Sequence, residues 1–224
     1  MDIRFLGQSC FEFSAGDTRL LVDPFLTGNP KAAASADEVD PTHILLTHGH
    51  ADHLGDTVDI AKRTGAPVVA IVELAGEIGE EGVDVIDPNI GGTVELDFAS
   101  VRLTPAWHTS TTPKGTVNTP AGLVIEMGGS TIYHLGDTAL FSDLALPAKR
   151  QQIDLALMCI GGHYTMDRFD GVAATQLVGA DRVIPCHYGT FPPIETDVQA
   201  FKQDVQNAGY AEVVVLDPGG TLEL

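Results

Sequence analysis

The sequence feature that most restricts the fold is the segment at residues 47–55, which reads THGHADHLG. Four of its side chains, all within six residues, are potential metal ligands. They are His48, His50, Asp52 and His53. The apolar residues 44–46 before the segment predict a buried strand, and residues 56–63 after it predict a helix. The ligands therefore lie on a turn between a strand and a helix, where side chains can converge on one point.

Imidazole and carboxylate groups bind zinc, manganese and iron. Because only one residue separates His48 from His50, both can reach the same ion, and Asp52 and His53 can serve a second ion. Gly49 leaves the backbone room to bend. A polar loop that collects histidines by chance does not explain this density of ligands. A structural zinc site usually contains cysteine, and none lies near the segment.

The pattern His-x-His-x-Asp-His after an apolar strand resembles the metallo-β-lactamase superfamily. In that superfamily the motif holds two metal ions together with three later ligands, and this sequence has a candidate for each. They are His108, Asp137 and His187. The resemblance covers the whole chain. Within the superfamily, the sequence most resembles small metal-dependent hydrolases related to L-ascorbate-6-phosphate lactonase. The segments that carry it are residues 7–11, 23–30, 161–166 and 187–192.

The resemblance implies an α/β fold, a four-layer αββα sandwich with the metal site at one edge of the two sheets. It also implies three roles for the ligands. His48, His50 and His108 are expected at one ion, Asp52, His53 and His187 at the other, and Asp137 between them. A carboxylate suits the bridging position because it has two oxygens, whereas a histidine cannot bind both ions.

The order of the predicted elements favours one domain over residues 1–224. A strand, a glycine-containing turn, a second strand and an aspartate occur at residues 10–23 and again at 123–137, which suggests two half-domains, roughly 1–115 and 116–224. The other predicted strands lie at 3–6, 42–46, 68–72, 83–86, 94–96, 101–104, 153–160, 182–186 and 213–216, and the other predicted helices at 73–79, 170–178 and 198–207. Residues 27–40 and 109–120 are expected to form loops near the site.

Two residues are candidates for direct participation in catalysis: Asp52 from within the ligand set and His163 from outside it. His163 follows a strand and two glycines, so its loop can pass close to a ligand; a substrate contact and an ordinary loop position remain equally open. Asp23 is expected to orient a ligand histidine through a hydrogen bond. Gln8 and Asn29 are weaker candidates for substrate contact.

The two remaining histidines are expected to have structural positions. His43, which precedes a strand, is expected at the surface. His134 is expected to pack in the core or to hydrogen-bond a neighbour rather than to bind metal.

Charge restricts the partners. Acidic residues number 31 against 12 basic ones, so the formal net charge is −19, and two divalent ions would leave −15. A field of this sign repels phosphate backbones, so no nucleic-acid partner is expected. If a phosphate group is recognised, Arg168 is the first candidate to contact it. The acidity itself has a simpler explanation in solubility or in a salty or acid-rich host cytosol.

The three cysteines, Cys10, Cys159 and Cys186, are far apart and form no Cys-x-x-Cys pair, which indicates small core residues rather than a disulfide framework. The sequence shows no signal peptide and no apolar run of about 18 residues. A cytoplasmic location without membrane contact is therefore expected. The sequence leaves the oligomeric state open, and a homo-oligomer is compatible with it.

The expected activity is that of a dinuclear metal-dependent hydrolase. Two ions about 4 Å apart can hold a bridging hydroxide and polarise the scissile bond. Zinc is the first choice, then manganese, with iron also compatible. By analogy with the lactonase relative, the substrate is expected to be a small ester, lactone or amide.

Three other functions remain as alternatives. A phosphodiesterase would use the same metals but fits the net charge poorly. An iron redox enzyme often carries a flavodoxin-like domain in this superfamily, for which the chain has no residues left. A non-catalytic metal-dependent scaffold does not need the complete ligand set.

Overall fold

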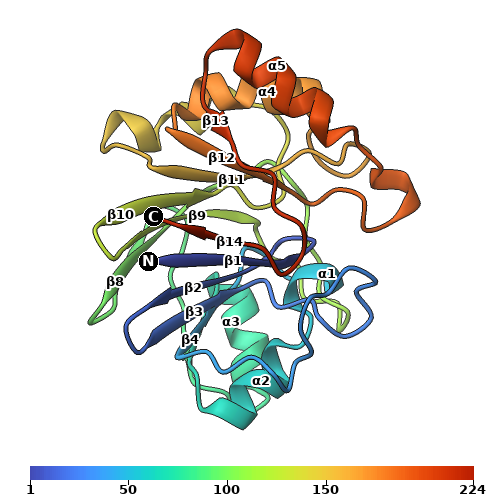
Figure 1. Ribbon diagram of the computed structural model, residues 1–224. Helices are drawn as coiled ribbons and strands as arrows, with labels where there is room; N and C mark the ends of the chain where they lie inside the picture. The colour runs from blue at the N-terminus through green and yellow to red at the C-terminus, as the bar shows by residue number, and fades with distance from the viewer.

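Two mixed β-sheets of seven strands each form the centre of the computed structural model, which describes residues Met1–Leu224 (Figure 1). In spatial order the first sheet contains β14 (Thr221–Glu223), β1 (Asp2–Gly7), β2 (Cys10–Ala15), β3 (Thr18–Val22), β4 (His43–Leu45), β5 (Val68–Val69) and β6 (Val85–Ile86). The second contains β13 (Glu212–Val213), β12 (Arg182–Cys186), β11 (Leu155–Cys159), β10 (Ser130–His134), β9 (Ala121–Met127), β8 (Ala99–Pro105) and β7 (Thr93–Glu95).

Helices cover the outer faces of both sheets (Figure 1). They are α1 (Ala51–Leu54), α2 (Thr57–Thr64) and α3 (Val72–Gly79) on the side of the first sheet, and α4 (Arg168–Val178) and α5 (Val198–Ala208) on the side of the second. Three short 3₁₀ segments lie in loops, at Ser142–Ala145, Pro147–Lys149 and Pro192–Ile194. The four-layer αββα sandwich is therefore confirmed. None of the helices combines the length and the apolar character that crossing a membrane requires.

The two sheets have the same internal plan. Each has three antiparallel strand pairs followed by three parallel ones, in the orders β14-β1-β2-β3-β4-β5-β6 and β7-β8-β9-β10-β11-β12-β13. The chain changes sheets between β6 and β7, so the expected half-domain boundary near residue 115 lies inside the second sheet, between β8 and β9. Strand β14, which the sequence did not predict, pairs with β1 and brings the two termini together (Figure 1).

Strand β11 shows why the central strands are continuously apolar. Leu155 and Leu157 belong to the core between the two sheets, whereas Ala156 and Met158 belong to a second core beneath α4 and α5. Successive side chains of a strand point to opposite faces, and here both faces are covered. Packing on both faces holds this strand in place and therefore fixes the start of the loop that follows it.

Helix termini follow the expected chemistry. Asp167 caps α4 by accepting hydrogen bonds from the backbone N–H groups of Phe169 and Asp170, and Gly179 ends the helix with a left-handed conformation. Predicted strands were too long in places: residues 214–216 were expected to continue β13, which ends at Val213, and residues 70–72 were expected to continue β5, but Val72 begins α3. The parallel neighbour β6 has only two residues, so the ladder that could extend β5 ends at Val69.

The fold brings several strand ends to one edge. Strands β1, β3 and β4 of the first sheet run in the same direction, as do β8, β10 and β12 of the second. The loops that leave these ends carry the candidate ligands.

Candidate metal centre

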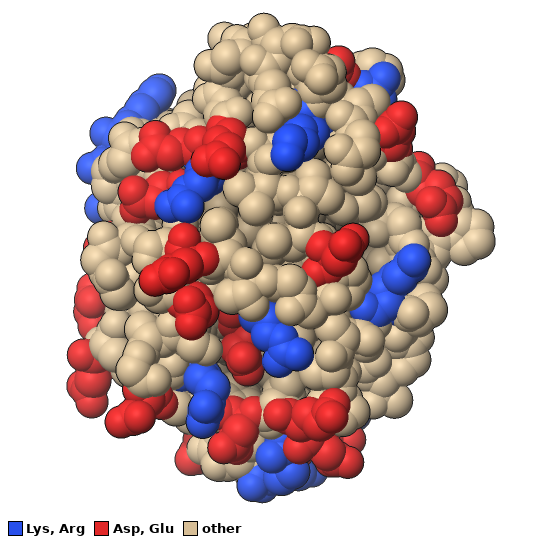
Figure 2. Space-filling model, viewed as in Figure 1, with Lys and Arg blue, Asp and Glu red and all other residues tan.

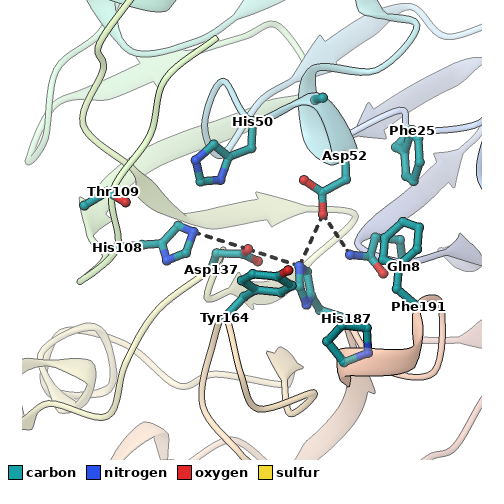
Figure 3. A pocket seen from close by; sticks show the side chains of 12 residues that line it. Gln8, Phe25, His50, Asp52, His108, Thr109, Asp137, Tyr164, His187 and Phe191 are labelled. Atoms are coloured by element: carbon teal, nitrogen blue, oxygen red, sulfur yellow. Dashed lines mark hydrogen bonds and ion pairs between the residues drawn. The ribbon is translucent and has the colours of Figure 1, made fainter. Parts of the chain in front are cut away.

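Four chain segments bring the seven predicted ligands together at this edge. The turn after β4 supplies four of them, and the loops after β8, β10 and β12 supply one each. Figure 3 shows five of the ligands, His50, Asp52, His108, Asp137 and His187. We call His48, His50 and His108 the first ligand group and Asp52, His53 and His187 the second ligand group. Within each group the ligand atoms lie within 4.8 Å of one another, and Asp137 forms a third such set with His48 and His53.

Asp137 lies between the two groups. Its Oδ2 atom is 3.1 Å from His187 Nε2 and 3.3 Å from His53 Nε2. The same oxygen is 3.6 Å from His108 Nε2 and 4.0 Å from His48 Nε2. Ligand atoms around one tetrahedral zinc ion are about 3.4 Å apart, given bonds of about 2.1 Å. The spacings around Asp137 are therefore those of atoms that share an ion.

Buried atoms without partners show that the site fits a metal. His53 Nε2 and Asp137 Oδ1 are buried and have no hydrogen-bond partner. An unpaired polar atom in the interior costs about 1–3 kcal/mol. Imidazole nitrogen and carboxylate oxygen are also the atoms that zinc, manganese and iron prefer. Bound divalent ions would satisfy both atoms, so the seven residues form a suitable metal centre.

Asp23 sets the orientation of two ligand histidines from behind. Its Oδ2 accepts hydrogen bonds from His53 Nδ1 at 2.7 Å and from the Thr47 hydroxyl at 2.6 Å. The Thr47 oxygen in turn lies 3.0 Å from His48 Nδ1 and can accept its proton. In their neutral, metal-binding form both rings would keep the proton on Nδ1, which leaves the Nε2 lone pair directed into the site. The expectation that Asp23 hydrogen-bonds a ligand histidine is confirmed.

The 109–120 loop supports the metal-binding turn. The backbone N–H of Gly49 donates to Ser110 Oγ at 3.0 Å and to Asn118 Oδ1 at 3.1 Å. A Cβ atom at Gly49 would lie 2.6 Å from Asn118 Nδ2 and 2.8 Å from Thr112 Cγ2, too close for either contact. Gly49 is therefore needed for close packing against this loop. Only Thr109 of the loop lines the cavity at the site.

The two ligand groups differ electrostatically. Burial lowers the pKa of His48, His50 and His108, so the first ligand group favours neutral rings. Burial acts in the same direction on the second group, but there the Asp137 carboxylate outweighs it. The pKa of His187 is raised to about 9, and that of His53 is also raised, with Asp23 contributing.

Asp137 itself remains ionised. Burial tends to raise the pKa of its carboxyl group, but the neighbouring His187 and His53 outweigh burial and hold the pKa well below its ordinary value. A carboxylate that stays charged in a buried position is suited to bind cations.

Backbone strain is concentrated at this edge. The non-glycine residues with positive φ are Gln8 at 57°, Asp23 at 45°, His163 at 54° and His187 at 53°. Each follows the end of a strand that reaches the site. The left-handed conformation costs about 1–2 kcal/mol for a residue with a Cβ atom. Its concentration here is typical of a functional site.

A cavity of about 520 Å³ opens beside the ligands (Figure 3). Five of the seven ligands line it, together with Gln8, Ala51, Thr109 and four residues that the sequence did not single out. Those four are Phe25, Tyr164, Phe191 and Pro193. Each lies within a few residues of a candidate site residue, a proximity that could have indicated them. Gln8 Nε2 donates a hydrogen bond to Asp52 Oδ2 at 2.9 Å.

Three other predicted site residues do not line the cavity. The exposed ring of His163 packs edge-on against Tyr164, with centroids 4.4 Å apart, and it is Tyr164 that reaches the cavity. The buried Asn29 side chain bonds the backbone of Phe25 and Lys31. Arg168 is paired with Asp204 and lies over the Phe169 ring.

The other two histidines have structural positions. His134 is buried, and its Nδ1 accepts a hydrogen bond from the backbone N–H of Gly136, as expected of a packed residue. The expected surface position of His43 was wrong. It begins β4 half-buried, and its ring packs edge-on against Phe98, with centroids 5.0 Å apart. All three cysteines are buried and unpaired.

Comparison with known proteins agrees with this geometry. A model of the beta-lactamase superfamily domain matches residues 18–188. The UPF0173 metal-dependent hydrolase of Methanopyrus kandleri is 44% identical over 229 residues and 100% of both chains. A relative of the same name from Thermococcus onnurineus is 46% identical over 99% of both chains.

A solved structure agrees closely in fold as well. Igni18, a metallo hydrolase from Ignicoccus hospitalis, is 35% identical and superposes with a TM-score of 0.91, over 100% of this chain and 98% of its own. The chain therefore belongs to the beta-lactamase superfamily and is a metal-dependent hydrolase of the metallo-β-lactamase type.

Proposed function

We propose that the protein is a dinuclear hydrolase that cleaves a small ester, lactone or amide, with zinc as the metal of first choice. The observation that carries this proposal is the position of Asp137. Its Oδ2 lies within 4.0 Å of histidines from both ligand groups, and its Oδ1 is buried without a partner. One carboxylate with a free oxygen between two sets of imidazoles is suited to hold two ions.

The residues divide the work as follows. The two ligand groups would each hold one ion, and Asp137 would contact both. Bound divalent ions supply Lewis acidity, lowering the pKa of a water molecule and polarising the bond to be broken. Asp52 lines the cavity, held by Gln8, so it can both bind metal and accept a proton there. His163 lies outside the ligand set and the cavity, and its ring supports Tyr164, which lines the cavity.

Charge argues against a phosphodiester substrate. No lysine or arginine is among the residues that line the cavity. On the face shown in Figure 2, basic side chains are scattered among acidic ones apart from a small group at the upper left edge, and they form no stripe that could follow a phosphate backbone. We therefore propose a small molecule, rather than nucleic acid, as the substrate.

Metal analysis and a substrate screen test the proposal. Protein purified without chelator and saturated with zinc or manganese should contain two ions per chain. It should hydrolyse at least one ester, lactone or amide, and chelator should abolish that activity reversibly. A ceiling of one ion under saturating metal would rule out the dinuclear mechanism. Faster turnover of bis(para-nitrophenyl) phosphate than of every ester, lactone and amide would favour a phosphodiesterase instead.

A further inference from the structure

The walls of the cavity differ sharply in chemistry. Figure 3 shows the ligands gathered on one side, with Phe25 and Phe191 beyond Asp52 and with Tyr164 facing the cluster. The Phe25 and Phe191 rings come from loops far apart in sequence and lie 6.3 Å apart, tilted by 36°. Pro193 extends the same surface. An apolar wall opposite a few convergent polar groups is the usual composition of a small-molecule site.

Phe25, Phe191 and Tyr164, which we call the aromatic wall, line the cavity and do not pack in the hydrophobic core. The Tyr164 side chain is 55% exposed, and both phenylalanines are only half-buried. Neither phenylalanine belongs to the buried clusters between the layers of the fold. These rings therefore have free apolar surface that a ligand can cover, and removing such surface from water favours binding.

The charges of the cavity argue against a substrate that carries a phosphate or a free carboxylate. No lysine or arginine lines the cavity, and its two carboxylates, Asp52 and Asp137, both belong to the predicted ligand set. Arg168, the basic residue expected to contact a phosphate, is paired with Asp204 instead. A phosphate or carboxylate placed against the aromatic wall would lose water without gaining a cation, which is costly.

We propose that the cavity takes a small uncharged carboxylic ester or lactone whose apolar group packs against Phe25, Phe191 and Tyr164. This inference rests on the proposed hydrolase function and narrows its substrate class. The reaction adds one water to the acyl carbon, breaks the acyl C–O bond and releases a carboxylate, a proton and an alcohol. The cavity volume of about 520 Å³ fits a molecule of this size.

A matched pair of substrates isolates the effect of charge. Para-acetoxybenzamide and para-acetoxybenzoate have the same scissile bond and nearly the same shape, but only the second carries a distal negative charge. With the zinc-loaded protein we expect kcat/KM to be at least about tenfold higher for the uncharged amide, the scale of discrimination that a pocket achieves against a misfit group. Equal values, or a preference for the benzoate, would overturn the proposal.

Variants of the wall isolate the aromatic contact. Phe191→Ala should raise KM for phenyl acetate by about tenfold, the loss of one aromatic contact and its buried area, and change KM for methyl acetate less than about twofold. Phe169→Ala is the matched control, because Phe169 is 64% exposed but does not line the cavity. Phe191→Arg should shift the preference toward para-acetoxybenzoate by supplying the missing cation. Identical effects of Phe191→Ala on both acetates would overturn the proposed contact.

A binding measurement separates the substrate class from the hydrolase function. Phenylacetone has the shape of phenyl acetate, with a methylene group in place of the ester oxygen, and cannot be hydrolysed. By calorimetry or saturation-transfer NMR it should bind at least about tenfold more tightly than its para-carboxylate. Binding of this kind without turnover of any ester would support the substrate-sized apolar site and contradict the hydrolase function. Ester turnover with no preference for the uncharged substrate or for the uncharged ketone would support the hydrolase function and contradict the proposed substrate class.

Discussion

The first and second sheets follow the same strand plan but contribute different parts of the site. After β3 comes Asp23, which accepts hydrogen bonds from the ligand His53 and from Thr47, whereas after the equivalent strand β10 comes Asp137, at the centre of the ligands. After β4 comes the turn with four ligands. After the equivalent strand β11 come two glycines, His163 and Tyr164, none of which belongs to a ligand group.

The remaining equivalent strands continue this difference. Strand β1 leads to Gln8, which hydrogen-bonds a ligand, whereas β8 leads to the ligand His108. Strand β5 leads to no ligand, whereas β12 leads to His187. One half thus concentrates four ligands in a single turn, and the other spreads three over separate loops and supplies part of the cavity wall. A symmetric scaffold with asymmetric loops can place two ligand groups and part of the cavity wall at one edge.

The largest effect is expected from replacing each of the two equivalent aspartates, Asp137 and Asp23, by asparagine. Asp137→Asn should leave the protein folded but lose most hydrolysis and at least one ion, because the central carboxylate contacts both ligand groups. Asp23→Asn should be milder, with a loss of about 10- to 100-fold in metal affinity or activity, the usual effect of removing a hydrogen-bond partner of a ligand. Metal content by elemental analysis and kcat/KM of both variants provide the measurement.

The order of these two effects is the informative result. If Asp137→Asn kept two ions and full activity, Asp137 would be only a turn residue after Gly136. If Asp23→Asn were the more damaging change, the roles of the two halves would be reversed. Circular dichroism of both variants checks that either loss arises in the site and not from unfolding.

The second largest effect is expected in the turn after β4, which carries four of the predicted ligands. Gly49→Ala forces a Cβ atom to within 2.6 Å of Asn118 Nδ2, in a loop contributed by the chain between β8 and β9. We expect a loss of about 1–3 kcal/mol in the free energy of unfolding, typical of overpacking, together with weaker metal binding because His48 and His50 flank the glycine.

Gly76→Ala is the matched control for this substitution. Gly76 lies inside α3, and an added Cβ atom would meet nothing within 4 Å. Alanine at this position should raise the free energy of unfolding by about 0.5–1 kcal/mol, through higher helix propensity. Chemical denaturation of both variants gives the comparison. A Gly49→Ala protein as stable and as metal-rich as the Gly76→Ala protein would show that the turn does not depend on the second half for its shape.

The asymmetry of the halves also explains how far the sequence could predict the site. The turn after β4 is recognisable by itself because His48, His50, Asp52 and His53 are adjacent in sequence. His108, Asp137 and His187 are single residues at separate strand ends, and only the family resemblance picked them out. Their convergence depends on sheet packing, which no local pattern encodes.

The same reasoning accounts for the parts that were missed. The aromatic wall joins Phe25 to Phe191 across the sheets, a contact without any local signal. Strand β14 has only three residues and owes its conformation to pairing with β1. Asn29 looks from the sequence like a residue free to contact substrate, but its amide satisfies the backbone of its own loop. Strand β11 was predicted well because burial on both faces requires an unbroken apolar run.

The third effect separates the two ligand groups by pH. In the metal-free protein at pH 7 the first ligand group is neutral, since burial lowers the pKa of its histidines. His187 and His53 of the second group have raised pKa values, about 9 for His187, and must lose their protons before they can bind metal. Affinity for the second ion should therefore rise by about tenfold per pH unit for each proton displaced, from pH 7 to about 9.

Calorimetry of zinc binding in buffers with different ionisation enthalpies counts these protons. The first ion should bind with little pH dependence over the same range and with little proton release. The same pH slope for both ions would contradict the electrostatic difference between the groups. His187→Ala should remove much of the slope of the second ion, whereas His50→Ala should weaken the first ion without changing that slope.

The smallest effect tests the loop after β11, the counterpart of the dense turn. His163 was a candidate for substrate contact or proton donation, with an ordinary loop position equally open; a direct role should give about a 10²-fold loss of kcat on removal. Its exposed ring instead packs on Tyr164, which lines the cavity. We therefore expect His163→Ala to keep both ions and to lower kcat/KM by less than about tenfold, the scale of one lost aromatic contact. Tyr164→Ala should have a similar effect, and the double variant should be no worse than either.

A 10²-fold fall in kcat for His163→Ala, with Tyr164→Phe unaffected, would restore the direct acid–base role. Loss of an ion would instead make the loop after β11 a ligand donor like its counterpart after β4.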